Sequence, residues 1–249
     1  MPVPSILLEV IATTLSDAQT AARAGADRIE LVTGLAEGGL TPSIGLIEAV
    51  ARAVPIPVNV IVRPHSRGFV YTAEELAILE RDTQAAVAAG ASGIVFGALN
   101  AHGDIDAAAL ARIVEAAGGK PITFHRAFDV SRDLNAAFET LLKTPAVTSV
   151  LTSGGHPSAL DGRDTIARLA RRASGQGCEV LAGAGLTVDS IGDFVRATGV
   201  RAVHLGTGVR ERGESWGPVD ARLVAKVRAT LDAALRDQAR LAERSPRLP

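Results

Sequence analysis

Short apolar runs rich in β-branched residues alternate with longer amphipathic segments along almost the whole chain. The apolar runs are nearly continuous, which is typical of parallel strands that are covered on both faces. The segments between them have the periodicity of helices, and several begin at Ser, Thr or Asp and end at Gly. The eight apolar runs are SILLEVIA (5–12), DRIELV (27–32), PVNVIVRP (57–64), SGIVFGAL (92–99), KPITFH (120–125), TSVLTSG (148–154), CEVLAGAG (178–185) and RAVHLGTG (201–208).

Eight such strand–helix units fit into a chain of 249 residues, which is the number and length expected for a (βα)8 TIM barrel. A doubly wound α/β sheet is the alternative, but it usually has fewer strands. The GxGxxG turn that often follows its first strand is also absent here. No linker rich in Pro, Gly or Ser divides the chain. We therefore predict a single α/β domain, a barrel over residues 1–241, followed by a frayed tail over 242–249.

The composition is that of a soluble globular protein and excludes several classes of function. Charged residues make up 21% of the chain and the formal net charge is −1, so we expect no nucleic-acid partner. No apolar run is long enough to span a membrane and no signal peptide is evident. We therefore expect no membrane association and a cytoplasmic location. Cys178 is the only cysteine, which excludes an intrachain disulfide and CxxC-type zinc or redox chemistry.

Polar side chains recur in the predicted strands at positions that face the inside of a barrel. Because strand residues alternate between two faces, counting by twos along each run gives one inward-facing set. A single buried ion pair or a hydrogen-bonded core histidine would explain any one of its polar members. Six of them from six strands favour a functional pocket, since each buried charge costs several kcal/mol unless it is paired. The polar members are Glu9, Glu30, Arg63, His125, Ser153 and His204.

The loops that follow the strands indicate an anionic ligand. Barrels commonly build phosphate sites after strands seven and eight, where this chain has the Gly-rich turns LAGAGLT and HLGTG. Arginines also follow the third and fifth runs, and guanidinium groups suit carboxylate or phosphate. The loop at 33–43 either closes over the mouth or is a plain connection, with Ser43 a candidate helix cap. The loop residues assigned to substrate binding are Arg67, Arg126, Asp129, Gly183, Gly185 and Gly206.

These same segments resemble the CutC family, which is named for copper homeostasis. The resemblance lies in GADRIELVTGLAEGGLTPS, IVRPHSRGFVY, GIVFGALNAHGDID, KPITFHRAFD, VLTSGG and HLGTG, and it covers about residues 7–208. The resemblance implies a (βα)8 barrel, a cytoplasmic location, a homo-oligomer (dimer or higher) and an association with copper tolerance.

Copper is the point at which this sequence departs from the family pattern. Many relatives carry a Cys two residues after the Glu of strand one and another after the Glu of strand two, and thiols are the ligands that Cu(I) prefers. Here those positions are Ile11 and Val32, and Cys178 lies at the start of the seventh run, where we expect a buried thiol. A divalent ion held by histidines and Glu9 or Glu30 is the other option, but no HxH or HxxxH spacing supports it. We predict no metal site, and copper as a cofactor rests on the family name alone.

An enzyme with acid–base chemistry is the function that these residues favour. We assign His125 as acid or base with Glu30 or Glu9 as its partner, and we include His204 among the catalytic residues. Arg63 and Arg126 would hold a small anionic molecule, phosphorylated or sugar-like, with Asp129 orienting Arg126. A non-catalytic copper-handling protein and a plain interaction scaffold are the alternatives, and no motif specifies the reaction.

Overall fold

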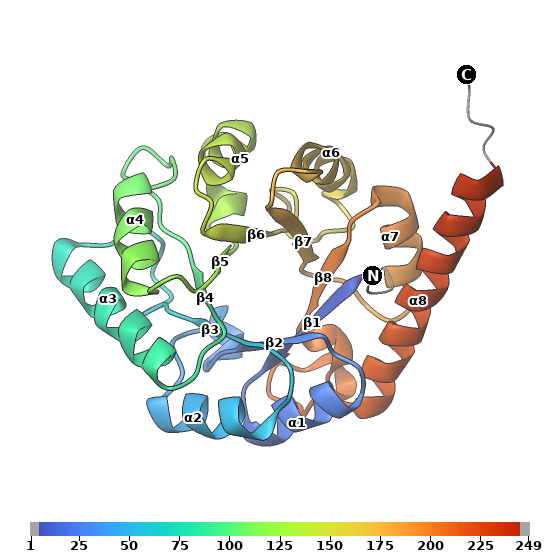
Figure 1. The fold of residues 1–249 in the computed structure, drawn as a ribbon, viewed down its shortest axis with the longest axis horizontal. Coiled ribbons are helices and arrows are strands. Elements are labelled where there is room, and N and C mark those ends of the chain that lie inside the picture. The colour runs from blue at the N-terminus through green and yellow to red at the C-terminus, as the bar shows by residue number, and fades with distance from the viewer. Residues whose placement is uncertain (1–4, 245–249) are drawn as a thin grey trace.

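The structure is a computed structural model that describes residues 5–244, with side chains described up to residue 237. Eight parallel strands form a closed barrel in sequence order, with the helices outside (Figure 1). The strands are β1 (Leu7–Ala12), β2 (Arg28–Leu31), β3 (Val58–Ile61), β4 (Gly93–Phe96), β5 (Ile122–Phe124), β6 (Val147–Thr152), β7 (Glu179–Gly183) and β8 (Ala202–Leu205). The helices are α1 (Leu15–Arg23), α2 (Ile44–Ala53), α3 (Ala73–Ala88), α4 (Ala107–Ala116), α5 (Leu134–Leu142), α6 (Arg163–Ala173), α7 (Ile191–Thr198) and α8 (Ala221–Arg244). The predicted (βα)8 barrel is confirmed, and each predicted run coincides with a strand, although β6 begins one residue before its run.

Side-chain caps fix the points at which the loops at the site end and the helices begin. Thr72 begins α3 with a capping box, in which its hydroxyl accepts the N–H of Glu75 and the Glu75 carboxylate accepts the N–H of Thr72. Ser43 accepts the N–H of Leu46 and begins α2, as the sequence predicts. The loops after β2 and β3 are therefore held at both ends.

The inward-facing set predicted by counting by twos is confirmed. Two small apolar clusters are separate from the main core that packs between strands and helices. Leu8 and Val10 of β1 belong to the main core, whereas Leu7 and Ile11 belong to the two small clusters. The remaining inward positions of the barrel hold the polar residues that form the site. The small clusters contain Ile11, Val32, Ile61 and Val95 in one, and Leu151, Leu181 and Ala202 in the other, with Leu7 and Leu35 packed against them.

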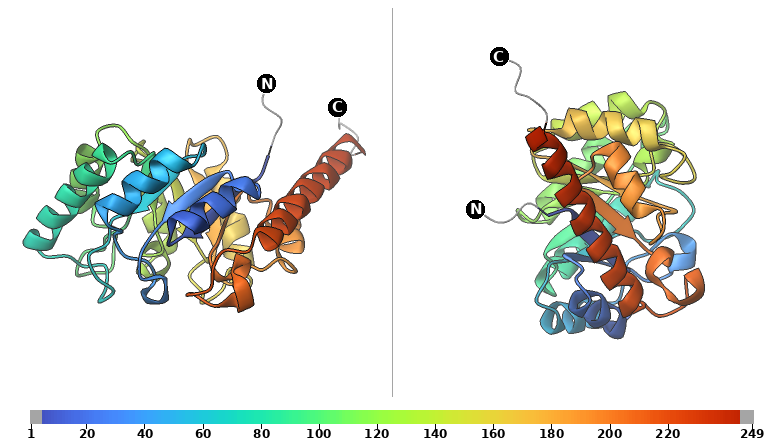
Figure 2. Two further views of the ribbon diagram at one scale, coloured as in Figure 1. Left: turned by 90° about the horizontal axis from the view of Figure 1, so that it is seen from below. Right: turned by 90° about the vertical axis from the view of Figure 1, so that its right-hand side faces the viewer.

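A buried ion pair ties the segment after β8 to the start of the barrel. Arg210 is 1% exposed, and its Nη2 lies 3.1 Å from a carboxylate oxygen of Asp17 in α1. Its Nη1 and Nη2 also donate to the carbonyl oxygens of Gly217 and Ile11. The same Asp17 accepts the N–H of Val219, just before α8. These contacts fix the start of α8, which packs against α1 and α7 along the outside of the barrel (Figure 2).

Helix α8 continues to Arg244, three residues past the boundary predicted at 241. The rest of the predicted tail, residues 245–249, lies outside the described residues, so the tail stays a prediction. Within the part of the chain that the structure describes, none of the helices has the length and hydropathy to cross a membrane.

Candidate active site at the carboxyl end of the barrel

A hollow of about 230 Å³ lies where the carboxyl ends of several strands meet, and it gathers most of the predicted site residues. Its volume is below the roughly 300–1,000 Å³ typical of pockets for drug-sized ligands, so the site favours a small molecule. Side chains from β2 and β8 and from the loops after β3 and β5 face one another across it. The predicted residues that line it are Glu30, Arg63, His125, Arg126, Gly185, His204 and Gly206.

His204 connects the two buried carboxylates of the site. Its Nδ1 lies 2.7 Å from Glu9 Oε1, and its Nε2 lies 3.6 Å from Glu30 Oε2. The second oxygen of Glu9 accepts a hydrogen bond of 2.5 Å from Nε of Arg28. Glu9 is fully buried and does not line the hollow, so it contacts His204 from inside the protein, while Glu30 lines the hollow.

The two carboxylates have opposite protonation behaviour because their partners differ. For Glu9, burial raises the pKa, but the positive charges and hydrogen bonds of Arg28 and His204 outweigh it and lower the pKa to about 2. For Glu30, burial raises the pKa to about 7, with the negative charge of Glu9 adding to the effect. Burial lowers the pKa of His204, but the neighbouring Glu30 and Glu9 raise it above its ordinary value. A carboxyl that titrates near neutrality is suited to acid–base catalysis.

His125 directly follows β5 and has no carboxylate partner among the side chains that the structure describes. Its Nδ1 accepts the N–H of Ala127 at 3.2 Å, and its Nε2 is buried without a hydrogen-bond partner in the described chain. Burial and the nearby positive charge of Arg63 lower its pKa to about 3. The predicted pairing of His125 with Glu30 or Glu9 is therefore wrong. The closed barrel places both carboxylates beside His204 on β8, which is next to β1.

Arg63 is anchored by the loop that follows β2. It is 6% exposed, its Nη1 donates to the carbonyl oxygens of Glu37 and Gly39, and its guanidinium lies 4.9 Å from the centre of the Phe69 ring. Its Nε is buried and has no partner among the described residues. The loop thus comes over the mouth at Gly38, where an added Cβ would lie 3.0 Å from Arg63 Nη1.

Asp129 orients Arg126, as the sequence predicts. The Nε of Arg126 donates to Asp129 at 2.8 Å, and its Nη2 donates to the hydroxyl of Ser153 at 2.8 Å. Asp129 also accepts the N–H groups of Ser153 and Gly155. Ser153 and Asp129 do not line the hollow, so they position Arg126 rather than contact a ligand.

The two Gly-rich turns after β7 and β8 contribute backbone groups to the hollow. Gly185, Leu186, Thr207 and Gly208 line it, and their N–H groups have no acceptor within residues 5–244. Ala184 adopts a positive φ of 78°, which turns this segment. Backbone N–H groups in Gly-rich turns beside a hollow are suited to binding an anion.

Besides Asp129 and Ser153, two further predicted substrate-binding residues do not line the hollow. Arg67 is on the surface, with its side chain 75% exposed and paired with Glu75 at 2.8 Å. Gly183 makes room for two side chains, because an added Cβ would lie 2.8 Å from Cδ1 of Leu151 and 3.1 Å from His204. Gly97 was not predicted to be part of the site, yet a Cβ added there would lie 2.4 Å from Nδ1 of His125. Its only sequence signal is a glycine at the end of the fourth apolar run.

The donor set of the site fits a metal ion poorly. One atom each from Glu9, Glu30 and His204 lies within 4.8 Å of the others. Both oxygens of Glu9 already accept hydrogen bonds, however, and the adjacent Arg28 guanidinium would repel a cation. Cu(I) prefers thiolate ligands, and none lines this hollow.

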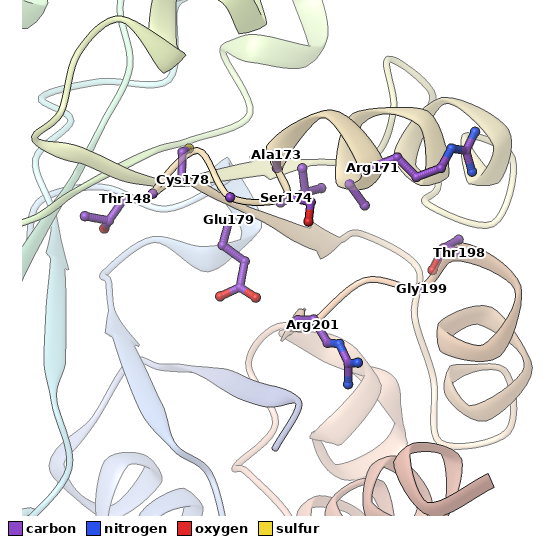
Figure 3. Close-up of a pocket in the computed structure, with 13 residues that line it drawn as sticks. Thr148, Arg171, Ala173, Ser174, Cys178, Glu179, Thr198, Gly199 and Arg201 are labelled. Carbon is purple, nitrogen blue, oxygen red and sulfur yellow. The ribbon is translucent and has the colours of Figure 1, made fainter. Parts of the chain in front are cut away.

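The cysteine lies in a different part of the barrel. Cys178 directly precedes β7, at the amino end of that strand, and lines a separate hollow of about 590 Å³ with Glu179 and Arg201 (Figure 3). Burial raises the pKa of its thiol to about 11, which disfavours the thiolate that copper needs. Ile11 and Val32, at the family's Cys positions, pack in an apolar cluster. Neither the pocket nor Cys178 fits copper(I).

These observations define a class of protein: a single (βα)8 barrel with buried carboxylates, histidines and arginines gathered at its carboxyl mouth. The chain belongs to the CutC family, whose model matches residues 6–209. A family protein CutC of Xanthomonas campestris pv. campestris (strain 8004) is 41% identical over 219 residues, which covers 88% of this chain and 87% of that protein. The "Copper homeostasis protein cutC homolog" of Homo sapiens is 41% identical over 198 residues, covering 80% of this chain and 72% of the human protein.

Solved structures give the same fold. A CutC protein from Streptococcus agalactiae is 32% identical with a TM-score of 0.75, covering 80% of this chain and 97% of that chain. N-(5'-phosphoribosyl)anthranilate isomerase from Pyrococcus furiosus has a TM-score of 0.58 at 14% identity, covering 92% of this chain and 99% of that chain. The second likeness shows the fold alone. The cytoplasmic location and the homo-oligomer stay predictions.

Proposed function

We propose that this protein is an enzyme that binds a small anionic molecule at the barrel mouth and moves a proton on it. The main observation in support of this proposal is that one small hollow is lined by Glu30 and two histidines, His125 and His204, together with Arg63 and Arg126. The residues come from strands far apart in sequence, which is how barrel enzymes assemble their active sites.

Two features support an anionic ligand. Arg63 and Arg126 provide positive charge at the hollow, and the turns after β7 and β8 add unpaired N–H groups. Phosphate and carboxylate oxygens accept from both kinds of donor. The acid–base role falls to Glu30 with His204, because a Glu30 pKa of about 7 leaves both protonation states populated near neutrality.

A binding measurement with inorganic phosphate tests the anion site. We expect phosphate to raise the melting temperature of the wild-type protein in a saturable manner. Arg126→Ala should abolish the effect, because its guanidinium faces the hollow. Arg67→Ala is the matched control, since that arginine lies outside the hollow and pairs with Glu75. Equal responses of the two variants would contradict the proposal.

The names of the relatives suggest copper handling without catalysis as the second candidate. A titration with Cu(I) against a competing chelator separates the two functions. We expect no sub-micromolar binding, because the hollow has no thiolate and Cys178 is buried elsewhere. Tight binding that disappears in His125→Ala or Cys178→Ala would overturn the enzyme proposal in favour of copper handling.

A further inference from the structure

We propose that His125 is an uncharged hydrogen-bond donor that holds a carbonyl oxygen of the substrate through Nε2–H. This inference rests on the proposed function and names the substrate class: a small anion with a carbonyl group next to a C–H bond. It also changes the role of His125, which the sequence assigns as an acid or base.

The hydrogen bonds of His125 determine which ring nitrogen carries the imidazole proton. The N–H of Ala127 donates to Nδ1 of His125 at 3.2 Å. A ring nitrogen that accepts a hydrogen bond carries no proton, so the proton of the neutral ring is on Nε2. Burial and the positive charge of Arg63 hold the pKa of His125 at about 3, so the ring stays neutral at physiological pH. His125 therefore presents an N–H donor and no free basic nitrogen.

The surroundings of Nε2 indicate what this donor binds. Nε2 is buried and has no acceptor in the described part of the chain, although the His125 side chain lines the hollow. Buried polar groups are nearly always hydrogen-bonded in folded proteins. The missing acceptor is therefore expected from a molecule in the hollow, and a donor of this kind requires an oxygen or nitrogen with a lone pair.

The His125 ring is held in place by its neighbours. His125 packs against Phe69, with ring centres 5.0 Å apart, and its backbone N–H donates to the carbonyl oxygen of Phe96. On another side of the ring lies Gly97, and the approach is so close that a Cβ at residue 97 would clash with His125. A donor held in place before the ligand arrives stabilises developing negative charge without reorganisation, which is the property of an oxyanion site.

These features define the chemistry at the site. When the C–H bond next to the carbonyl breaks, its proton passes to the Glu30 carboxylate, and its electron pair forms a C=C bond. The π electrons of the carbonyl move to oxygen, where Nε2–H of His125 keeps its proton and donates to the oxyanion. Where the carbon that lost the proton also carries a hydroxyl group, the hydroxyl proton passes to the oxyanion. The Glu30 proton then returns to the former carbonyl carbon, the new carbonyl forms at the hydroxyl-bearing carbon, and the isomerisation is complete without any exchange of electrons with a cofactor. Neutral imidazoles polarise carbonyl groups in this way in other enzymes.

The test combines a spectroscopic measurement with a pair of matched ligands. The ¹⁵N NMR spectrum of histidine-labelled protein, with His125→Phe used to assign the ring signals, should show a protonated Nε2 and a bare Nδ1 from pH 5 to 9. Dihydroxyacetone phosphate and glycerol 3-phosphate differ in a carbonyl against a hydroxyl, so their binding isolates the carbonyl contact. We expect the wild type to favour the carbonyl compound about tenfold, and His125→Phe to lose that preference while it still binds both.

The outcomes separate this inference from the function on which it rests. A His125 ring that titrates between pH 5 and 8, or that carries its proton on Nδ1, would overturn the inference and leave the anion site intact. The same holds if the wild type shows no preference, or if the preference survives in His125→Phe. If neither phosphate compound binds the wild type, both the proposed function and this inference are wrong.

Discussion

Glu30→Gln is expected to raise the free energy of unfolding at pH 8, whereas Glu9→Gln is expected to lower it. The two glutamates lie on neighbouring strands, both are buried, and both approach His204. Both substitutions are nearly isosteric, so packing changes little. The difference in unfolding free energy between the two variants therefore reflects the electrostatic environment of each carboxylate.

The magnitude for Glu30 follows from the cost of ionising it in the folded state. Burial raises its pKa from an ordinary 4.5 to about 7. At about 1.4 kcal/mol for each pH unit, this corresponds to about 3 kcal/mol of destabilisation once the carboxyl is ionised. Because the folded pKa is raised, the destabilisation is absent below pH 4.5 and develops as the pH rises to about 7. Glu30→Gln should match the wild type at pH 4 and exceed its stability by up to about 3 kcal/mol at pH 8.

Ionised Glu9 stabilises the folded protein, whereas ionised Glu30 destabilises it. Burial alone would raise its pKa, but Arg28 and His204 lower it from 4.5 to about 2. A lowered folded pKa contributes stability above pH 4.5, and this stability is lost as the pH falls towards 2. Glu9→Gln should therefore lose about 3 kcal/mol at pH 8, and it also leaves the Arg28 guanidinium without its ion partner.

Urea unfolding followed by circular dichroism at pH 4, 6 and 8 measures these differences. Glu48→Gln is the control, because Glu48 lies on the surface of α2 and its removal should change stability by less than about 0.5 kcal/mol at each pH. If Glu30→Gln lost as much stability at pH 8 as Glu9→Gln, the reasoning would be refuted. Pairing with His204 would then outweigh the burial of Glu30.

Two further predictions concern a buried ion pair and the packing around His125. Arg210→Met should lower the free energy of unfolding by about 3–5 kcal/mol in urea denaturation, because it leaves Asp17 buried without its cation; a loss below 1 kcal/mol would show that this pair does not hold the barrel closed. Gly97→Ala should cost about 1–3 kcal/mol and shift the ¹⁵N signals of His125, since the new Cβ would lie 2.4 Å from Nδ1. Gly45→Ala in α2, where nothing lies within 4 Å, should instead be neutral or slightly stabilising, and equal losses in both variants would contradict the steric explanation.

The local pattern of the sequence was sufficient to predict the fold and the inward-facing residues. Strand and helix periodicities depend on short-range backbone geometry, so eight alternating units identify the barrel without knowledge of distant contacts. Counting by twos also placed Glu9, Glu30 and His204 on the inner face, where the structure has them. The motifs and their order were enough to indicate the CutC family.

Partnerships between side chains depend on the closed barrel and could not be predicted. Glu9 contacts His204 because β8 closes against β1, 195 residues away in the chain, and places the imidazole beside that carboxylate rather than beside His125. Arg63 and Arg67 were both predicted to bind substrate, but Arg63 is held at the hollow by carbonyl groups of the loop after β2, whereas Arg67 pairs with Glu75 on the surface.

Alternation along a strand therefore determined which residues face the interior of this protein, because that property belongs to each strand alone. Which residues meet, which nitrogen of His125 carries the proton, and which carboxyl titrates near neutrality were decided only by the tertiary structure. Those properties arise from strand register, loop positions and burial, which bring distant groups within a few ångströms of one another and remove them from water.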